Sequence, residues 1–305
     1  MKRDKSRRKI FMVLQEKYTL NNQLEVPKIA FGTWQISNEN VILAVKEALE
    51  IGYRHIDTAI HYENEEGVGK AIRESSIPRE DIFVTTKIPP EVKTYEGAKA
   101  CIENSIERLD IGVIDQVLIH SPKPWRELLV GSPKPYFDEN LAVWKAMEEA
   151  VEEGKIRSIG VSNFEIADLE NILKNGKIKP AVNQVEVHIG LTPRDIMEYC
   201  EKHDILIMAY SPNATGKLIN DPVVKRVADK YGVSVPQLSI RYDLQIGVLP
   251  LPRSTNPVHM KENANLDFVI LEEDMITLSK VKERHNLWWR RVSKVIRNIR
   301  SFGKK

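Results

Sequence analysis

Short apolar runs alternate regularly along the chain with longer stretches that have helical spacing. The short runs contain four to seven residues and fit buried strands. In the stretches between them, apolar residues recur every three or four positions, which is the spacing of one face of an α-helix. The pattern predicts eight strands, at residues 30–34, 56–59, 82–88, 114–119, 156–161, 181–187, 205–210 and 248–251.

Helices are predicted between these strands. The expected ranges are 38–49, 65–74, 95–109, 140–153, 166–174, 193–203, 221–231, 235–246 and 257–263. A short hairpin is expected before the first strand, over residues 18–29. Strands that alternate with helices are parallel and joined by right-handed crossovers, so eight such units predict an α/β fold of the (β/α)₈ TIM-barrel type. The alternative is an open doubly wound sheet, but no G-x-G-x-x-G follows an early strand.

Composition and the cysteines place the chain in a broad class. With 305 residues, 42% hydrophobic and 29% charged, the chain resembles a soluble globular enzyme. No apolar run approaches the roughly 20 residues that span a bilayer, and residues 10–14 are too short for a signal-peptide core. Cys101 and Cys200 lie far apart without metal-ligand spacing, so we expect thiols in a cytoplasmic protein, with a disulfide left open.

Charge is segregated between the ends and the body of the chain. Residues 1–9 contain six basic residues and one acidic residue, and residues 284–305 contain eight basic residues and no acidic one. The remaining residues 10–283 carry a net charge of about −11. An acidic body argues against nucleic-acid binding. We expect one barrel domain over residues 1–283, including a basic N-terminal extension at 1–16, and a basic C-terminal extension at 284–305.

The C-terminal extension has the pattern of a basic amphipathic helix. Trp288, Val292, Val295, Ile299 and Phe302 form one apolar stripe at helical spacing, and the arginines and lysines lie largely off it. Such a helix can lie on an anionic membrane or dock on a partner. We expect residues 286–305 to pack against the acidic barrel, with contact to a membrane surface as the alternative.

Polar residues collect where the predicted strands end. In a barrel these carboxyl ends meet on one face, which is where active sites are found. Each residue alone has an ordinary explanation, such as a helix cap or a solvated lysine, but their recurrence at successive strand ends favours a functional site. The residues are Asp57, Lys87, His120, Ser162, Asn163, Gln184, Tyr210, Arg253 and Ser254.

Several ordered motifs between residues 18 and 274 resemble the aldo-keto reductase family, in particular the bacterial aldehyde, diketogluconate and glyoxal reductases. The motifs are GYRHIDTAIHYENEEGVGKAI, VTTKI, VLIHSP, IRSIGVSNF, NQVEVH, MAYSP and LPRSTNP. The resemblance implies a (β/α)₈ barrel and the nicotinamide-dependent reduction of aldehydes or ketones to alcohols. It places four catalytic residues, with Tyr62 as proton donor, Lys87 as the cation that stabilises its anion, Asp57 as the partner of Lys87, and His120 as a donor to the substrate oxygen.

The resemblance also implies a cofactor site, because the sequence has no metal-ligand cluster and the hydride needs an organic donor. Ser162, Asn163 and Gln184 would hold the nicotinamide amide, Tyr210 would stack on its ring, and Ser211 would meet the pyrophosphate. The adenosine end would meet Arg253, Ser254, His259, Glu262 and Asn263. The family usually has arginine where this chain has His259, so we expect NADPH to be favoured and NADH to be possible.

Substrate binding is predicted at Trp34, Tyr62 and His120. Many relatives have tryptophan directly after the catalytic histidine, but this chain has Ser121, and whether Trp125 or Phe137 reaches the pocket is left open. Small aldehydes, α-dicarbonyls such as methylglyoxal, and keto-sugars are the expected substrates, and we expect a monomer. Two alternatives are a cofactor-binding regulatory subunit without significant turnover and a barrel aldolase or isomerase with Lys87 as a Schiff base.

Overall fold

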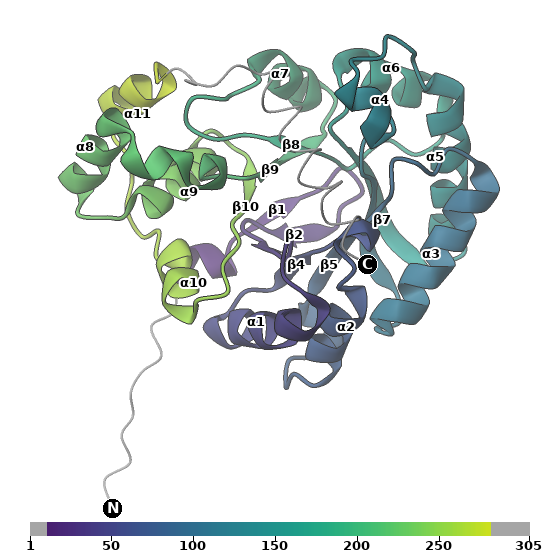
Figure 1. Ribbon diagram of the computed structural model, residues 1–305, viewed down its shortest axis with the longest axis horizontal. Coiled ribbons are helices and arrows are strands. Elements are labelled where there is room, and N and C mark those ends of the chain that lie inside the picture. The colour runs from purple at the N-terminus through teal and green to yellow at the C-terminus, as the bar shows by residue number, and fades with distance from the viewer. Residues whose placement is uncertain (1–10, 282–305) are drawn as a thin grey trace, which may run out of the picture.

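A parallel barrel forms the centre of the computed structural model, which describes residues 11–281 (Figure 1). Its strands neighbour one another in chain order, and every pairing is parallel. The backbone N–H groups of Ala30 and Gly32 donate to the carbonyls of Pro250 and Pro252, which joins the last strand to the first. The predicted (β/α)₈ barrel is therefore confirmed. Its strands are β3 (Phe31–Gly32), β4 (His55–Asp57), β5 (Phe83–Ile88), β6 (Ile114–Ile119), β7 (Ile156–Ser162), β8 (Val182–Glu186), β9 (Leu206–Tyr210) and β10 (Leu249–Leu251).

Helices surround the barrel and bury their apolar faces against the strands (Figure 1). Side-chain caps explain several of their boundaries: Ser37 and Thr94 each accept a hydrogen bond from a backbone N–H of the first turn. The helices are α1 (Asn38–Ile51), α2 (Glu65–Arg73), α3 (Tyr95–Leu109), α4 (Trp125–Leu129), α5 (Phe137–Glu152), α6 (Ile166–Asn175), α7 (Arg194–Lys202), α8 (Pro222–Tyr231), α9 (Val235–Gln245), α10 (Pro257–Ala264) and α11 (Glu272–Ser279).

Among the strands and α-helices, the observed elements differ most from the sequence prediction in three places. Strand β3 has only two residues, because the chain turns away at Gln35, whose φ is 61°. Helix α4 lies inside the connection that was expected to be a loop. Helix α11 was not predicted either. Within residues 11–281, no helix is long and apolar enough to span a bilayer.

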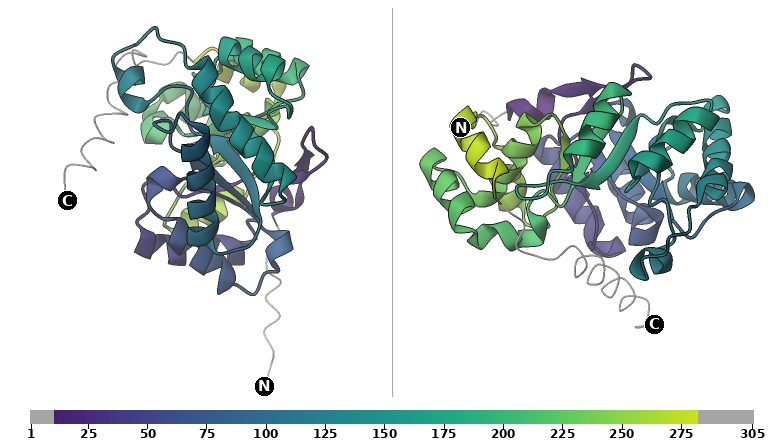
Figure 2. Two further views of the ribbon diagram at one scale, coloured as in Figure 1. Left: turned by 90° about the vertical axis from the view of Figure 1, so that its right-hand side faces the viewer. Right: turned by 90° about the horizontal axis from the view of Figure 1, so that it is seen from above.

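A two-stranded hairpin, β1 (Lys17–Thr19) and β2 (Glu25–Pro27), closes one end of the barrel (Figure 2). The side-chain amide of Asn21, in its turn, donates to the carbonyls of Pro180 (2.8 Å) and Asp204 (3.0 Å), which lie just before β8 and β9. The hairpin therefore covers the amino ends of the strands, and the carboxyl ends stay open for the site.

The chain enters this hairpin from a buried segment. Residues 12–15 form a 3₁₀ turn, in which Val13 and Leu14 are buried in the main core. This turn lies within the range predicted as an N-terminal extension. The expected C-terminal helix lies outside the described residues, as do residues 1–10.

A chain of polar side chains crosses the barrel interior between β4 and β7. Nε2 of His55 lies 2.8 Å from Oγ1 of Thr85, which donates to Oε1 of Gln116 at 3.2 Å. The amide of Gln116 then donates to Oγ of Ser158 at 3.3 Å. These polar contacts therefore link four neighbouring strands of the barrel through its interior.

Candidate active site

A cavity of about 420 Å³ opens among the carboxyl ends of the strands. Most of the predicted site residues line it, and Lys87 lies completely buried behind its wall. The predicted residues on the wall are Trp34, Asp57, Tyr62, His120, Ser162, Asn163, Gln184, Tyr210, Ser211 and Arg253. The strand ends thus gather on one face residues that are up to 219 positions apart in the sequence, from Trp34 to Arg253.

Lys87 is held by three oxygen atoms. Its Nζ lies 2.7 Å from Oδ1 of Asp57, 2.8 Å from the carbonyl of Thr58 and 3.4 Å from the hydroxyl oxygen of Tyr62. An ammonium group has three hydrogens to donate, so three acceptors match its protonated form. Burial lowers the pKa of Lys87, and the charge of Asp57 acts in the opposite direction. The geometry therefore provides an ion pair beneath the hydroxyl of Tyr62.

Asp57 is fixed through both of its carboxylate oxygens. Oδ1 accepts from Lys87, and Oδ2 accepts from the side-chain amide of Gln184 at 2.7 Å. Sequence reasoning assigned Gln184 to the cofactor and missed this second contact, because the two residues are 127 positions apart. The amide of Gln184 therefore links the wall of the cavity to the buried ion pair.

Tyr62 is poised to remain protonated. Burial raises the pKa of its hydroxyl well above the ordinary value, and the charge of Asp57 and the neighbouring Tyr210 raise it further. The oxygen of Tyr62 accepts the hydrogen bond from Lys87, so its own O–H hydrogen is free to be donated elsewhere. This is the protonation state that a proton donor needs.

His120 lies beside Tyr62 at the end of β6. The two rings meet edge to face, with centroids 5.7 Å apart. The backbone of His120 is fixed on both sides, since its N–H donates to the carbonyl of Ile88 and its carbonyl accepts from the amide of Asn163. Its Nδ1 is buried, so Nε2 is the ring nitrogen that can reach the cavity.

Polar groups follow one another along the wall from His120 toward β9. The amide of Asn163 donates to Oγ of Ser162, and its carbonyl oxygen accepts from the hydroxyl of Tyr210 at 2.7 Å. Asn163 has a φ of 60° and Ser211 a φ of 55°, conformations that cost energy in most residues and cluster at functional sites. This combination of amide, hydroxyl and aromatic groups fits a nicotinamide, whose carboxamide needs both donors and acceptors and whose ring needs a flat neighbour.

The far end of the cavity is positively charged. Lys217 and Arg253 line it, together with the turn at Thr215 and Gly216, where φ is again positive. Backbone N–H groups in such turns and cationic side chains suit an anion, so this end fits a phosphate. A side-chain nitrogen of Arg253 donates to Gln35 at 3.3 Å. Lys217 was not identified from the sequence.

Four of the predicted cofactor residues do not line the cavity. Ser254 makes a turn with Asn256, which caps α10, whereas His259 and Glu262 are exposed on α10 and Asn263 is buried. They lie within ten residues after Arg253 in the chain. Their assignment to the adenosine end therefore stays a prediction.

Two rings on the cavity wall were not assigned from the sequence. His61 precedes Tyr62, and Trp125 is the first residue of α4. The ring of Trp125 lies 5.3 Å from that of His120 and 6.4 Å from that of His61, measured between centroids. Phe137, which was considered together with Trp125, does not line the cavity.

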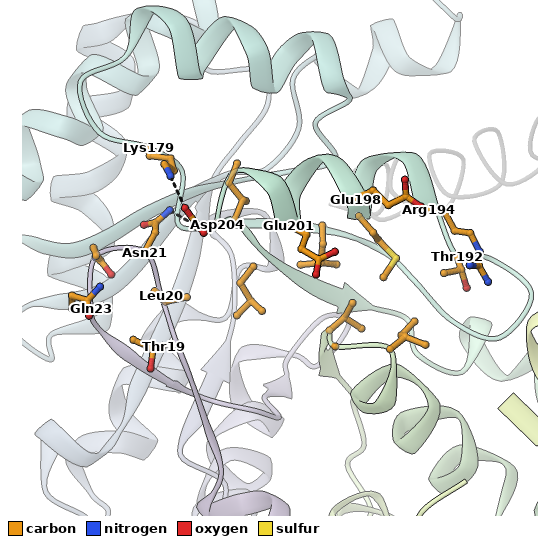
Figure 3. A pocket seen from close by; sticks show the side chains of 18 of the residues that line it. Thr19, Leu20, Asn21, Gln23, Lys179, Thr192, Arg194, Glu198, Glu201 and Asp204 are labelled. Carbon is orange, nitrogen blue, oxygen red and sulfur yellow. Dashed lines mark hydrogen bonds and ion pairs between the residues drawn. The ribbon is translucent and has the colours of Figure 1, made fainter. Parts of the chain in front are cut away.

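A larger hollow of about 1100 Å³ lies at the hairpin end of the barrel, between β1, α7 and α9 (Figure 3). Its charged side chains partly neutralise one another, as in the pair of Lys179 and Asp204 at 3.1 Å. None of the predicted catalytic residues lines it. We therefore assign the site to the smaller cavity at the carboxyl ends of the strands.

Comparisons with known proteins agree with this fold. The sequence model of the Aldo/keto reductase family matches residues 28–283. Glyoxal reductase of Bacillus subtilis (strain 168) is 41% identical over 264 residues, which is 86% of this chain and 91% of that protein. Methylglyoxal reductase DkgA of Escherichia coli (strain K12) is 35% identical over 265 residues, with coverages of 86% and 92%.

A solved structure adds a cofactor-bound neighbour. The crystal structure of an aldo-keto reductase of Bombyx mori in complex with NADP has a TM-score of 0.79 and 32% identity, and it covers 89% of this chain and 94% of that one. The chain belongs to the aldo/keto reductase family. It is an NAD(P)H-dependent oxidoreductase that reduces carbonyl groups.

Proposed function

We propose that this enzyme reduces small aldehydes and α-dicarbonyl compounds to alcohols with NADPH, using the proton of Tyr62. The observation that carries this proposal is the arrangement of Asp57, Lys87, Tyr62 and His120 at the end of one cavity. The names of the glyoxal and methylglyoxal reductases among the relatives support the substrate class. Keto-sugars are the alternative class of substrate.

Proton delivery follows from the contacts around Tyr62. When NADPH is bound, its nicotinamide supplies the hydride that the carbonyl carbon accepts. The substrate oxygen then gains negative charge and takes the proton from Oη of Tyr62. The tyrosinate that remains lies 3.4 Å from the ammonium of Lys87, which stabilises it. Asp57 keeps that ammonium in position through the 2.7 Å contact.

His120 orients the substrate oxygen. Its ring lines the cavity beside that of Tyr62, and Nε2, in the tautomer that carries hydrogen there, would donate to the same oxygen. Two donors converging on one atom fix the face of the carbonyl that is presented to the cofactor. Ser162, Asn163 and Tyr210 would hold the nicotinamide at that face.

The preference for NADPH rests on charge at the far end of the cavity. Arg253 lies there and suits the 2′-phosphate, which NADH lacks. His259 is exposed on the next helix and does not line the cavity. The Bombyx mori neighbour, whose structure holds NADP, also supports NADPH.

The Schiff-base alternative is disfavoured by the position of Lys87. Its side chain has no solvent-exposed surface and is engaged by three acceptors. An attacking amine must be neutral and must reach the substrate carbon. Lys87 is therefore better suited to supporting Tyr62 than to attacking a carbonyl.

A substrate panel tests the proposal. Methylglyoxal, glyoxal, a short aldehyde and a keto-sugar are each incubated with the purified enzyme, and the loss of NADPH or NADH absorbance is followed. We expect the highest kcat/KM for an α-dicarbonyl with NADPH. Equal or higher kcat/KM with NADH would contradict the cofactor preference, and turnover limited to the keto-sugar would contradict the substrate class.

A further inference from the structure

Helix α4 brings a tryptophan to the catalytic histidine. Trp125 lines the cavity and meets the ring of His120 edge to face, at 5.3 Å and 79°. His61 contacts the same indole, with ring centroids 6.4 Å apart. Trp125 thus belongs to the wall that surrounds the proton-donating end of the site.

The residue directly after His120 cannot form this wall. Ser121 is completely buried, and its side chain does not line the cavity. Its hydroxyl has no hydrogen-bond partner among residues 11–281, and its backbone carbonyl accepts from Lys93. An aromatic surface next to His120 therefore has to come from farther along the chain, and Trp125 provides it.

Local contacts hold Trp125 in this position. The backbone N–H of Trp125 donates to the carboxylate of Glu91, in the connection between β5 and α3, at 3.2 Å. Pro124 precedes the helix, and its carbonyl accepts from the N–H of Leu128 at 3.1 Å. Lys123 donates to the carbonyl of Ser132, which ties together the two ends of the segment around α4. These hydrogen bonds therefore fix the position of the segment that carries the indole.

We propose that Trp125 is a specificity-determining residue, whose indole packs against the carbon skeleton of the substrate while Tyr62 and His120 hold its oxygen. This inference rests on the proposed function and adds the residue that selects substrate size. A flat ring at this distance from His120 favours small carbonyl compounds and leaves little room for a bulky group. Aromatic contacts of this kind change affinity by about threefold to tenfold.

The test compares methylglyoxal with phenylglyoxal, which carries a phenyl group in place of the methyl group. In Trp125→Ala, we expect KM for methylglyoxal to rise about threefold to tenfold, with kcat changed by less than about twofold. The ratio of kcat/KM for phenylglyoxal to that for methylglyoxal should rise at least about threefold. Trp125→Phe keeps a ring and should restore the wild-type KM within about twofold.

Controls separate the ring from the helix that carries it. Leu129→Ala changes the other end of α4, outside the cavity lining, and should leave both KM values unchanged. If Trp125→Ala does not fold, Trp125→Leu replaces it with the same expected change in the ratio. An unchanged ratio in an active variant, or an equal change in Leu129→Ala, would overturn the role of Trp125. A wild-type enzyme that reduces neither compound would instead overturn the proposed function, and this inference with it.

Discussion

Lys87 is a buried charge whose neighbours compensate it. Its ammonium meets the carboxylate of Asp57 at 2.7 Å, and Gln184 binds the other oxygen of that carboxylate. Removing one partner of a buried pair leaves the other charge without compensation, which costs far more than losing an exposed pair. Loss of either partner should therefore destabilise the barrel as well as remove the support of Tyr62.

Replacing Lys87 tests both roles. We expect Lys87→Met to lower kcat/KM by about 10²-fold to 10⁴-fold, and to lower the free energy of unfolding by about 3–5 kcal/mol. Asp57→Asn combined with Lys87→Met should recover part of the stability without recovering activity. Urea unfolding and NADPH oxidation measure the two effects.

The exposed pair of Lys17 and Glu25 is the matched control, and Lys17→Met should leave both the free energy of unfolding and kcat/KM almost unchanged. A stable, inactive Lys87→Met would contradict the buried-charge argument.

His55 makes the stability of the protein depend on pH. Burial lowers its pKa to about 3, whereas an unfolded chain has a histidine pKa of about 6.5. Between these values the unfolded state binds a proton that the folded state does not. The contribution of His55 is thus complete above pH 6.5 and is lost as the pH falls toward 3.

Replacing His55 by glutamine should flatten this dependence. Glutamine can still donate to Thr85 but does not titrate. Between pH 7 and pH 4.5, we expect the wild type to lose roughly 2–3 kcal/mol more stability than His55→Gln. Denaturant unfolding at the two pH values gives the difference. Parallel losses in both proteins would show that His55 does not titrate as described.

At the scale of elements, regular segments were easier to predict than the segments around the site. The predicted bounds of α3 and β6 match the observed bounds, because each lies between clear polar signals and has an uninterrupted period. Helix α4 was missed because five residues between prolines and a glycine are too few to reveal a helical period. Trp125 therefore could not be assigned to the cavity from the sequence.

The residue types of the proposed catalytic site could be predicted from the sequence, but the contacts among them could not. Asp57, Lys87 and His120 stand at strand ends, where a parallel barrel gathers its active site, and the family motifs mark Tyr62. The bond between Gln184 and Asp57 depends on which side chains meet across the barrel. The spacing of residues in the sequence carries no information on this hydrogen bond, which only the structure shows.

The connection between β10 and α10 carries the positive charge that we propose binds the cofactor phosphate. Arg253 follows β10 and lines the cavity, and a charged hydrogen bond to a phosphate contributes about 1.5–3 kcal/mol. In Arg253→Ala, we expect KM for NADPH to rise about tenfold to a hundredfold, with KM for NADH changed much less. Steady-state kinetics with both cofactors decides this. Lys261→Ala, on the exposed side of α10, is the control. Equal losses for the two cofactors would place Arg253 elsewhere than at the 2′-phosphate.

At the scale of the whole molecule, an acidic body is joined to two basic ends. Opposite charges within one chain attract one another, and the body carries about −11 between residues 10 and 283. We expect this attraction to compete with binding to an anionic surface. The full-length protein should therefore remain in the supernatant when vesicles with about 30% anionic lipid are sedimented at physiological salt.

Neutral vesicles are the control for that experiment. Sedimentation with anionic vesicles alone, reversed at high salt, would instead support the membrane alternative for residues 286–305.

The oligomeric state is a separate question, which light scattering on the same preparation answers. We expect a monomer of 35.0 kDa, the mass of the chain.

The proposed mechanism depends on proton donation by Tyr62, and the variant Tyr62→Phe removes the donating hydroxyl. Cofactor binding is measured by fluorescence titration, and methylglyoxal reduction by NADPH oxidation, in the wild type and the variant. We predict a loss of about 10²-fold to 10⁴-fold in kcat/KM, with NADPH affinity within about twofold of the wild type, because the ring remains and only the hydroxyl is lost. If the variant binds NADPH and still reduces methylglyoxal at a rate close to that of the wild type, Tyr62 is not the proton donor.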